Sequence, residues 1–308
     1  MPLDRRLQSL LRRANRALPG PDLERAIAAI RSVIGPSHVP AGGNLATVAL
    51  DKLHRQIAPD PEELAALELV IRQMRPMPLS VNGQLEDLPA GPGANMYPET
   101  LRQAWTQFRI RIAPYLYSIG RIELVDGECA GTGFLVGPDL VATNRHVAGT
   151  LSSGAENLSP GKARILFRHE AGAPDDPRLT AAILGVAAIH PRLDLALLRI
   201  PTQDRPPVPF GRTMLRAGDG IVAIGYPTQD SGRNPLFLET LLQGRYGVKR
   251  AAVGEILSME RPAFFHDCST TSGNSGSPLF SLRTGRSEEH PSELQSRGLI
   301  SYAVFCLK

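Results

Sequence analysis

Three segments of the sequence contain side chains that could together perform acyl transfer through a serine. GTGFLVGPDLVATNRHVAG contains His146, HPRLDLALLRI contains Asp194, and GNSGSP contains Ser275. A serine that attacks a carbonyl needs a base for its proton, a group that orients this base, and donors for the oxyanion. The segments therefore predict His146 as general base, Asp194 as its orienting carboxylate and Ser275 as nucleophile.

Each of these residues has a structural alternative when it is taken alone. A single histidine is more often structural than catalytic, and an aspartate before an apolar strand is common in turns. A G-x-S-x-G match is most often the nucleophile turn of an α/β-hydrolase. The chain order of that fold is Ser, acid, His, whereas the order here is His146, Asp194, Ser275. The order excludes the hydrolase interpretation if these three residues are the partners.

The three segments together resemble the trypsin-like, chymotrypsin-fold serine peptidases. The nucleophile of that family lies in G-[DN]-S-G-[GS]-P, and its aspartate begins D-[IL]-A-[LV]-L. The resemblance covers about residues 118–285 and is closest to the bacterial branch of glutamyl endopeptidases and HtrA-type peptidases, which share GNSG. It implies a serine endopeptidase that forms an acyl-enzyme in a double antiparallel β-barrel. It also implies an oxyanion hole made by the N–H groups of Gly273 and Ser275, which the flanking glycines let converge.

The residue before the nucleophile carries no charge in this sequence. In the digestive members of the family an aspartate at this place pairs with a newly cleaved N-terminal ammonium, and here it is Asn274. We therefore expect no activation by that ion pair, so that the residues preceding the peptidase can stay attached.

Specificity depends on the residues shortly before the serine. The resemblance places Ser269 at the base of the substrate pocket, with Thr270 beside it, and neither is anionic. The usual means of selecting Arg or Lys is therefore absent. Thr270 resembles the pocket threonine of glutamate-selecting members, which also use a histidine downstream of the serine. The alternative is that Ser269 and Thr270 only fill a pocket wall.

Composition excludes several other functions. The chain has 308 residues, 42% of them hydrophobic, and a net charge of +4, which is typical of a soluble globular protein and argues for neither nucleic acid nor membrane as partner. Arginines interrupt every apolar run of the first 20 residues, so we expect no signal peptide or membrane span, and a cytoplasmic protein. The three cysteines make no disulfide framework. His266 and Cys268 lack further ligands at metal-binding spacing, and we expect neither metal nor cofactor.

Around the three catalytic segments the sequence predicts two kinds of structure. Residues 1–77 show four amphipathic helical patterns and predict a small helical bundle. The fourth pattern starts most clearly, with Asp60 as cap, Pro61 in the first turn and Glu63 at the third helical position. The apolar stripes are Leu7, Leu10, Leu11 and Leu18; Leu23, Ile27, Ile30 and Ile34; Ala46, Ala49, Leu50, Leu53 and Ile57; and Leu64, Leu67, Ile71 and Met74.

The rest of the chain changes in period. Residues 78–97 are rich in Pro and Gly and predict a linker, and a helix is expected over 98–114. From Ser118 onward, short runs rich in Val, Ile, Leu and Phe alternate with turn residues, as in an antiparallel barrel. We therefore expect an α plus all-β protein: a helical adaptor or regulatory domain over 1–77, followed by a chymotrypsin-like peptidase over 98–285.

The last residues resemble no protein domain. Residues 286–296 read RSEEHPSELQS and residues 300–308 read ISYAVFCLK. Both resemble the in-frame translation of a common short-read sequencing adapter, with one base change at Pro291. We therefore expect 286–308 to be an artefact, Cys306 not to be natural, and the peptidase to be truncated near Gly285. A lost closing strand would leave an open edge and an unfilled core, so we expect the printed chain to be unstable and inactive.

These observations lead to one main hypothesis and one rival. The main hypothesis is an endopeptidase acting on protein or peptide substrates, with a helical domain that binds a protein partner or regulates access. The rival is a binding module on a protease scaffold that has lost catalysis, against which the complete set of His146, Asp194 and Ser275 argues.

Overall fold

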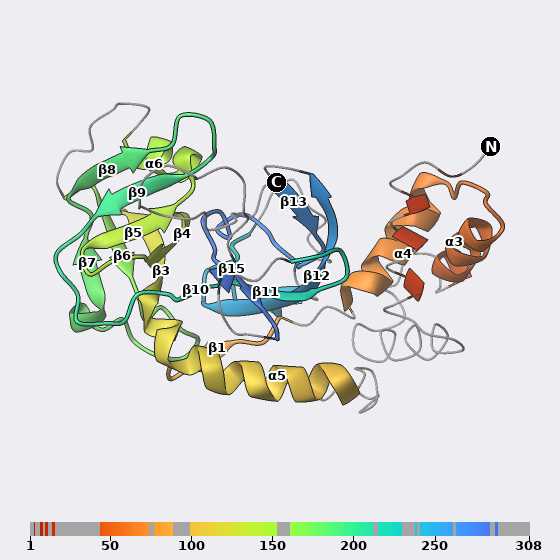
Figure 1. Cartoon of the computed structure of the whole chain (residues 1–308), viewed down its shortest axis with the longest axis horizontal. Helices are drawn as coiled ribbons and strands as arrows, with labels where there is room; N and C mark the ends of the chain where they lie inside the picture. The colour runs from red at the N-terminus through yellow and green to blue at the C-terminus, as the bar shows by residue number, and fades with distance from the viewer. Residues whose placement is uncertain are drawn as a thin grey trace. The chain divides into compact units, whose positions relative to one another are not determined.

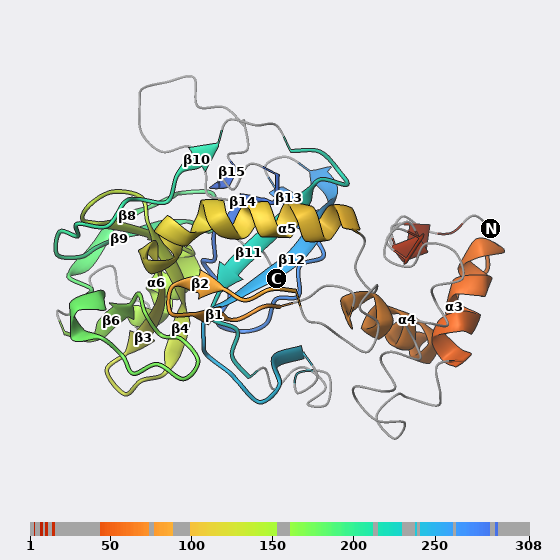
Figure 2. The ribbon, with the colours of Figure 1, turned by 90° about the horizontal axis from the view of Figure 1, so that it is seen from below.

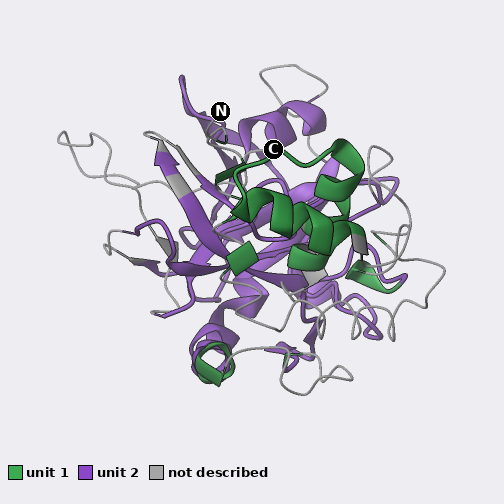
Figure 3. Ribbon diagram, turned by 90° about the vertical axis from the view of Figure 1, so that its right-hand side faces the viewer, with its two compact units in different colours: residues 1–76, 88–103, 233–243 green, residues 77–87, 104–232, 244–308 purple. Residues whose placement is uncertain are grey.

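The chain folds into two compact units. The computed structural model describes residues 3, 7–8, 10–11, 14–15, 44–73, 77–88, 99–152, 161–211, 215–229, 238, 241–260, 263–283 and 287–288. One unit comprises residues 1–76, 88–103 and 233–243, and the other comprises 77–87, 104–232 and 244–308 (Figure 3).

The first unit contains the predicted third and fourth helices, α3 (Asn44–His54) and α4 (Pro61–Gln73). α4 begins with a capping box, as predicted: Asp60 Oδ1 accepts the N–H of Glu63 at 2.9 Å, and Glu63 Oε2 accepts the N–H of Asp60 at 2.8 Å. Ile57 lies beyond the end of α3 and is 51% exposed, so it does not extend the apolar stripe. The stripe predicted from Leu23 to Ile34 lies outside the described residues. The core of the unit consists of Leu3, Leu10, Ala14, Ala46, Ala49, Leu50, Leu53, Ala66, Leu67, Val70 and Ile71.

Apart from a two-stranded hairpin described below, the described part of the second unit contains two sheets, each of them curled (Figure 1). The first sheet is antiparallel throughout, in the order β7-β6-β3-β4-β5-β9-β8, and the helix α6 (Arg145–Leu151) follows β5. Its inward-facing side chains form one apolar cluster that includes Ile122, Val141, Ile165 and Leu198. The strands are β3 (Ile119–Leu124), β4 (Cys129–Leu135), β5 (Leu140–Thr143), β6 (Ala163–Leu166), β7 (Thr180–Ala182), β8 (Gly185–Ile189) and β9 (Ala196–Arg199).

The second sheet has the order β10-β15-β14-β11-β12-β13 and is antiparallel except where β10 meets β15. Its strands are β10 (Phe210–Gly211), β11 (Gly220–Gly225), β12 (Arg250–Glu260), β13 (Ala263–His266), β14 (Leu279–Ser281) and β15 (Ser287–Glu288). Two such sheets, preceded in the chain by N-terminal helices, form the chymotrypsin-like architecture that the sequence predicts. β15 lies within the segment that resembles adapter, and the rest of that segment is outside the described residues.

Part of the predicted linker is an ordered hairpin of the second unit. β1 (Ser80–Val81) pairs with β2 (Gln84–Leu85). The turn residues Asn82 and Gly83 both have positive φ, 50° and 71°, as a type I′ turn requires. Its Ser80 N–H donates to Lys249 O at 2.9 Å, and Ala251 N–H donates to Pro78 O at 3.0 Å. The expected linker over 78–97 is therefore wrong for residues 78–87, because these hydrogen bonds attach them to the start of β12.

The predicted helix over 98–114 is α5 (Glu99–Ile112), continued by the 3-10 turn η2 (Ala113–Ser118). Figure 2 shows α5 in front of β11, β12 and β14. Phe108 of α5 contacts Phe280 of β14 with ring centroids 6.1 Å apart, and Arg111 Nη2 donates to Leu282 O at 3.2 Å. α5 therefore packs on the second sheet. No helix in the described ranges is both long and apolar enough to span a membrane.

A fully buried lysine joins several of these segments. Lys249 Nζ donates to Leu116 O at 2.6 Å and to Phe167 O at 2.7 Å. Nearby, the Glu170 carboxylate accepts the Ser80 hydroxyl at 2.6 Å and thereby holds the β1–β2 hairpin. Burial lowers the pKa of Lys249 from 10.5 to about 7, although the charge of Glu170 acts in the opposite direction.

This pKa predicts how stability changes with pH. Between pH 7 and 10.5 the unfolded chain binds more protons at Lys249 than the folded chain does, so stability rises with pH. Relative to Lys249→Met, the wild type should gain roughly a few kcal/mol of unfolding free energy between pH 7 and pH 10. Urea unfolding followed by the fluorescence of the only tryptophan, Trp105, measures this difference at each pH. A difference independent of pH contradicts the prediction.

Candidate active site

The described structure brings His146 and Asp194 together through two hydrogen bonds. His146 is the second residue of α6, which Asn144 precedes at the end of β5, and Asp194 lies just before β9. Because β5 and β9 are antiparallel neighbours, with Thr143 opposite Ala196, the two segments meet at one edge of the sheet. Asp194 Oδ2 lies 2.7 Å from His146 Nδ1, and its Oδ1 accepts the His146 N–H at 2.9 Å.

The position of the carboxylate determines which imidazole nitrogen is free. An ionised carboxylate accepts hydrogen bonds and cannot donate them. When Asp194 is ionised, its hydrogen bond with His146 therefore requires the proton on Nδ1 and leaves Nε2 as the nitrogen that can accept a proton. Asn144 Nδ2 donates to Asp194 O at 2.8 Å and fixes the backbone that carries the carboxylate. The His146 side chain is 54% exposed and that of Asp194 is 23% exposed, so the base is accessible from solvent while its partner is more protected.

Ser275 lies in a tight turn that is pressed against the first sheet. Gly273 and Gly276 have φ of +84° and +86°, the left-handed region that favours glycine. Thr132 N–H of β4 donates to Ser275 O at 2.7 Å. A Cβ added at Gly131 would lie 2.8 Å from both Ser275 O and a methyl of Val147, the residue after the histidine. The serine backbone and the start of α6 therefore flank the same glycine of β4.

Within the described part of the chain, no hydrogen bond joins Ser275 Oγ to His146 Nε2, a bond that often forms only in the complex with substrate. The N–H groups of Gly273 and Ser275 donate to no protein group among the described residues. Both are thus available to a developing oxyanion.

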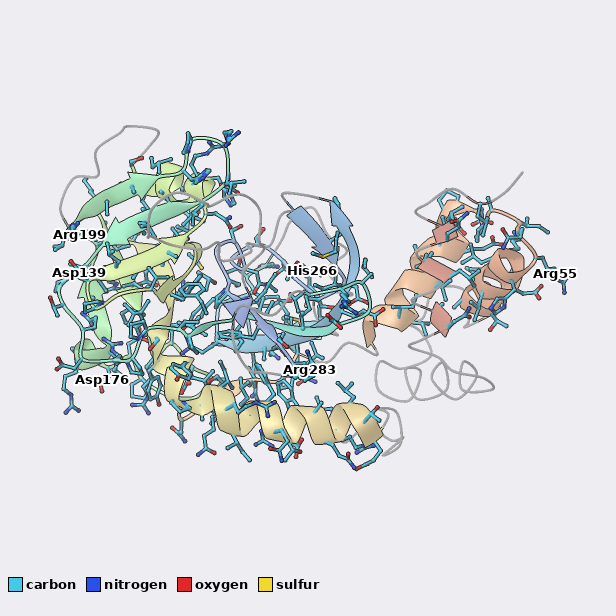
Figure 4. All side chains as sticks on the ribbon, in the orientation of Figure 1. Arg55, Asp139, Asp176, Arg199, His266 and Arg283 are labelled. Carbon is cyan, nitrogen blue, oxygen red and sulfur yellow. The ribbon has the colours of Figure 1, made fainter. Side chains whose placement is uncertain are left out.

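The residues predicted for the specificity pocket lie between β13 and the serine. Ser269 is 1% exposed, and its hydroxyl has no hydrogen-bond partner among the described residues. His266, labelled in Figure 4, ends β13 three residues earlier. Burial lowers the pKa of His266 to about 4, so this side chain is neutral at physiological pH. The two residues predicted for the pocket therefore carry hydroxyls, whereas the nearby buried Asp267 carries a carboxylate whose Oδ1 accepts the Glu255 N–H at 2.7 Å.

Sequence reasoning missed two residues that position this site, Thr132 and Asn144. Thr132 lies between two glycines in a strand, and Asn144 directly precedes the helix that carries the histidine. Asn144 stands at the N-cap position of α6, where asparagine is a common signal in the sequence, but its side chain bonds Asp194 O and does not cap the helix. Neither Cys129 nor Cys268 forms a disulfide, and burial raises the pKa of Cys129. In the described ranges no cluster of three or more His, Cys, Asp or Glu side chains could hold a metal ion.

Comparison with known proteins assigns the chain to a family. Residues 131–287, just over half of the chain, match the family described as trypsin-like peptidase domain. The chain belongs to this family.

Among its relatives is the probable periplasmic serine endoprotease DegP-like of Pseudomonas fluorescens, 32% identical over 161 residues, or 51% of this chain and 28% of that protein. Serine protease Rv3671c of Mycobacterium tuberculosis is 28% identical over 49% of this chain and 33% of its own length. Glutamyl endopeptidase of Staphylococcus epidermidis is 26% identical over 52% of each. The matched part thus spans between about a quarter and a half of these relatives.

Two solved structures are also similar. The crystal structure of Rv3671c protease in an inactive form matches with a TM-score of 0.38 and 23% identity, over 58% of this chain and 77% of that one. The crystal structure of Deg5 matches with a TM-score of 0.42 and 23% identity, over 59% of this chain and 82% of that one.

The tight turn predicts a steric test. A Cβ on Gly276 would lie 2.1 Å from Thr132 O and 2.4 Å from Thr143 Oγ1, in addition to the strain of its positive φ. Gly276→Ala should therefore lower the unfolding free energy by about 3 kcal/mol, measured by urea denaturation. Gly127 has the same φ, +86°, with nothing within 4 Å of an added Cβ, so Gly127→Ala should cost only about 1 kcal/mol. Equal losses in the two variants would contradict the steric account.

Proposed function

We propose that this protein is a serine endopeptidase that hydrolyses peptide bonds through an acyl-enzyme intermediate. One observation carries the proposal. Asp194 holds Nδ1 and the N–H of His146 at 2.7 and 2.9 Å, while the turn with Ser275 is bonded to the adjacent strand β4. This arrangement supports the three roles predicted from the sequence, within a domain of the trypsin-like family.

The proposed reaction begins when Ser275 Oγ attacks the carbonyl carbon of the scissile bond. Nε2 of His146 takes the hydroxyl proton, and Asp194 stabilises the imidazolium that results. The tetrahedral intermediate collapses as the C–N bond breaks, and His146 gives its proton to the leaving amine. Water then attacks the ester with the same base, releases the acid and restores Ser275.

The oxyanion of both tetrahedral intermediates would be bound by the N–H groups of Gly273 and Ser275. Donors fixed by a tight turn need no reorganisation when charge develops, which is why such groups contribute strongly to catalysis. The neutral side chain of Asn274 supports the further proposal that this turn does not depend on an ion pair with a free N-terminus.

For specificity we propose a pocket whose base includes Ser269 and Thr270. Their hydroxyls favour polar or acidic substrate side chains, or only form part of the pocket wall. In either case they offer no negative charge to an Arg or Lys of the substrate. The substrate would be a protein or peptide.

The helical residues 1–77 are proposed as an adaptor or regulatory domain that binds a protein partner, and residues 98–285 as the peptidase. A cytoplasmic site of action stays a prediction. The DegP-like relative is named as periplasmic, which favours an envelope compartment as the alternative.

The triad is tested by casein hydrolysis. Residues 286–308 are proposed to be an adapter artefact, so each variant is prepared in the genomic chain, in which the codons of the source genome follow Gly285. The wild-type genomic chain should hydrolyse casein, whereas the printed chain is expected to be inactive. Ser275→Ala should abolish hydrolysis. Asp194→Asn should lower kcat by about 10³–10⁴-fold, because the amide disfavours the required tautomer of His146.

Thr180→Val is the matched control. Among the described residues its hydroxyl donates only to Asp176 O, at 3.1 Å, and the variant should retain full activity. Hydrolysis that survives Ser275→Ala would refute the proposal. A wild-type genomic chain that folds but neither cleaves casein nor reacts with a fluorophosphonate would favour the rival binding module.

Specificity is tested with a peptide library that varies the residue before the scissile bond. Because no anion is predicted in the pocket, cleavage after Arg or Lys should be at least tenfold slower than after the preferred residue. Thr270→Val should reduce cleavage after Glu if its hydroxyl contacts the substrate. Preferred cleavage after Arg would contradict the predicted pocket.

A further inference from the structure

One fully buried side chain joins the predicted nucleophile turn to both sheets. Thr132 lies on β4 and is 0% exposed. Its N–H donates to Ser275 O at 2.7 Å, and its carbonyl accepts the Thr143 hydroxyl at 2.7 Å. Its own hydroxyl donates to Gly273 O at 2.7 Å and accepts the N–H of Tyr226 at 3.2 Å. Four segments of the chain therefore meet at this residue.

The backbone and side-chain bonds of Thr132 have different requirements. Any residue except proline could supply the N–H and the carbonyl. Only a hydroxyl can donate to Gly273 O and accept from Tyr226 N–H at the same point. Gly225, which ends β11, allows this close approach, because a Cβ there would lie 2.9 Å from Thr132 Oγ1. The hydroxyl is thus enclosed, and bulk solvent does not reach its two hydrogen bonds.

We propose that Thr132 is a positioning residue whose hydroxyl fixes the oxyanion hole. This inference rests on the proposed peptidase function. Gly273 has a φ of +84° and, as a glycine, can adopt many backbone conformations, so its N–H direction needs an external constraint. The hydrogen bond to its carbonyl supplies that constraint, while the Thr132 N–H fixes the carbonyl of Ser275. Both predicted oxyanion donors are therefore held in place by one residue of the opposite sheet.

The same contacts link the oxyanion hole to the general base. The Thr143 hydroxyl that donates to Thr132 O belongs to the last residue of β5, three positions before His146. A shift of Thr132 would therefore move the turn relative to the base. Removing the hydroxyl would also leave Gly273 O and Tyr226 N–H buried and unsatisfied, an unfavourable state that a displaced turn could relieve.

The test compares variants that keep or remove this hydroxyl. Thr132→Ser retains the donor, and Thr132→Val has the same shape without it. The probe is a fluorophosphonate, whose phosphoryl oxygen would occupy the oxyanion hole when Ser275 is modified. For Thr132→Val the maximal inactivation rate should fall at least tenfold, while the half-saturating probe concentration stays within twofold. Thr132→Ser should stay within threefold of the wild type.

Thr180→Val again serves as control, because it removes a threonine hydroxyl that also donates to a backbone carbonyl, but on β7. A structural defect alone would lower the fraction of folded protein and not the rate per folded molecule, which near-ultraviolet circular dichroism and active-site titration separate. If Thr132→Val does not fold, Thr132→Cys, with its weaker donor, replaces it and should react at least threefold more slowly than Thr132→Ser.

The outcomes separate this inference from the function on which it rests. A wild-type genomic chain that does not react refutes the peptidase. If the wild type reacts and Thr132→Val reacts at the same rate, the positioning role alone is overturned. If Thr132→Val does not fold, equal rates for Thr132→Ser and Thr132→Cys overturn that role.

Discussion

The candidate site depends on hydrogen bonds between Thr132 and the turn around Ser275. The Thr132 N–H and hydroxyl each donate across 2.7 Å, to Ser275 O and Gly273 O, and thereby hold the second sheet against the first. His146 and Asp194 are supplied by the first sheet alone, where β5 and β9 are adjacent. Ser275, the proposed nucleophile, is supplied by the turn that precedes β14 of the other sheet. Without these contacts to β4, the distance and orientation between the proposed base and the proposed nucleophile would not be fixed.

Glycines make this approach sterically feasible. An added Cβ at Gly131, Gly225 or Gly276 would come within 2.8, 2.0 or 2.1 Å of an atom of the facing segment. Real Cβ atoms do not approach so closely, so each of these positions needs a residue without a side chain. Gly131 of GTGF and Gly276 of GNSG thus serve packing between the sheets, and Gly276 also serves the backbone conformation of the turn. This accounts physically for the spacing of glycine and hydroxyl residues on both sides of the site.

The sequence predicted those features that local chemistry determines. The start of α4 follows from Asp60 and Glu63 within one turn, and the order of His146, Asp194 and Ser275 follows from three short motifs. The hairpin of residues 80–85 was missed because its Pro- and Gly-rich surroundings indicated a linker, although Asn82-Gly83 is a strong turn signal. Thr132 could not be identified in this way, since its partner Gly273 is 141 residues away and only the folded sheets bring them together.

The central claim is that Ser275 is a nucleophile activated by the base on the opposite sheet. Peptide mapping by mass spectrometry after treatment of the folded genomic chain with a fluorophosphonate tests it most directly. The account predicts one phosphonyl adduct per chain, located on Ser275 and absent from His146→Ala. An adduct on another residue, or equal modification of Ser275 without His146, would contradict it.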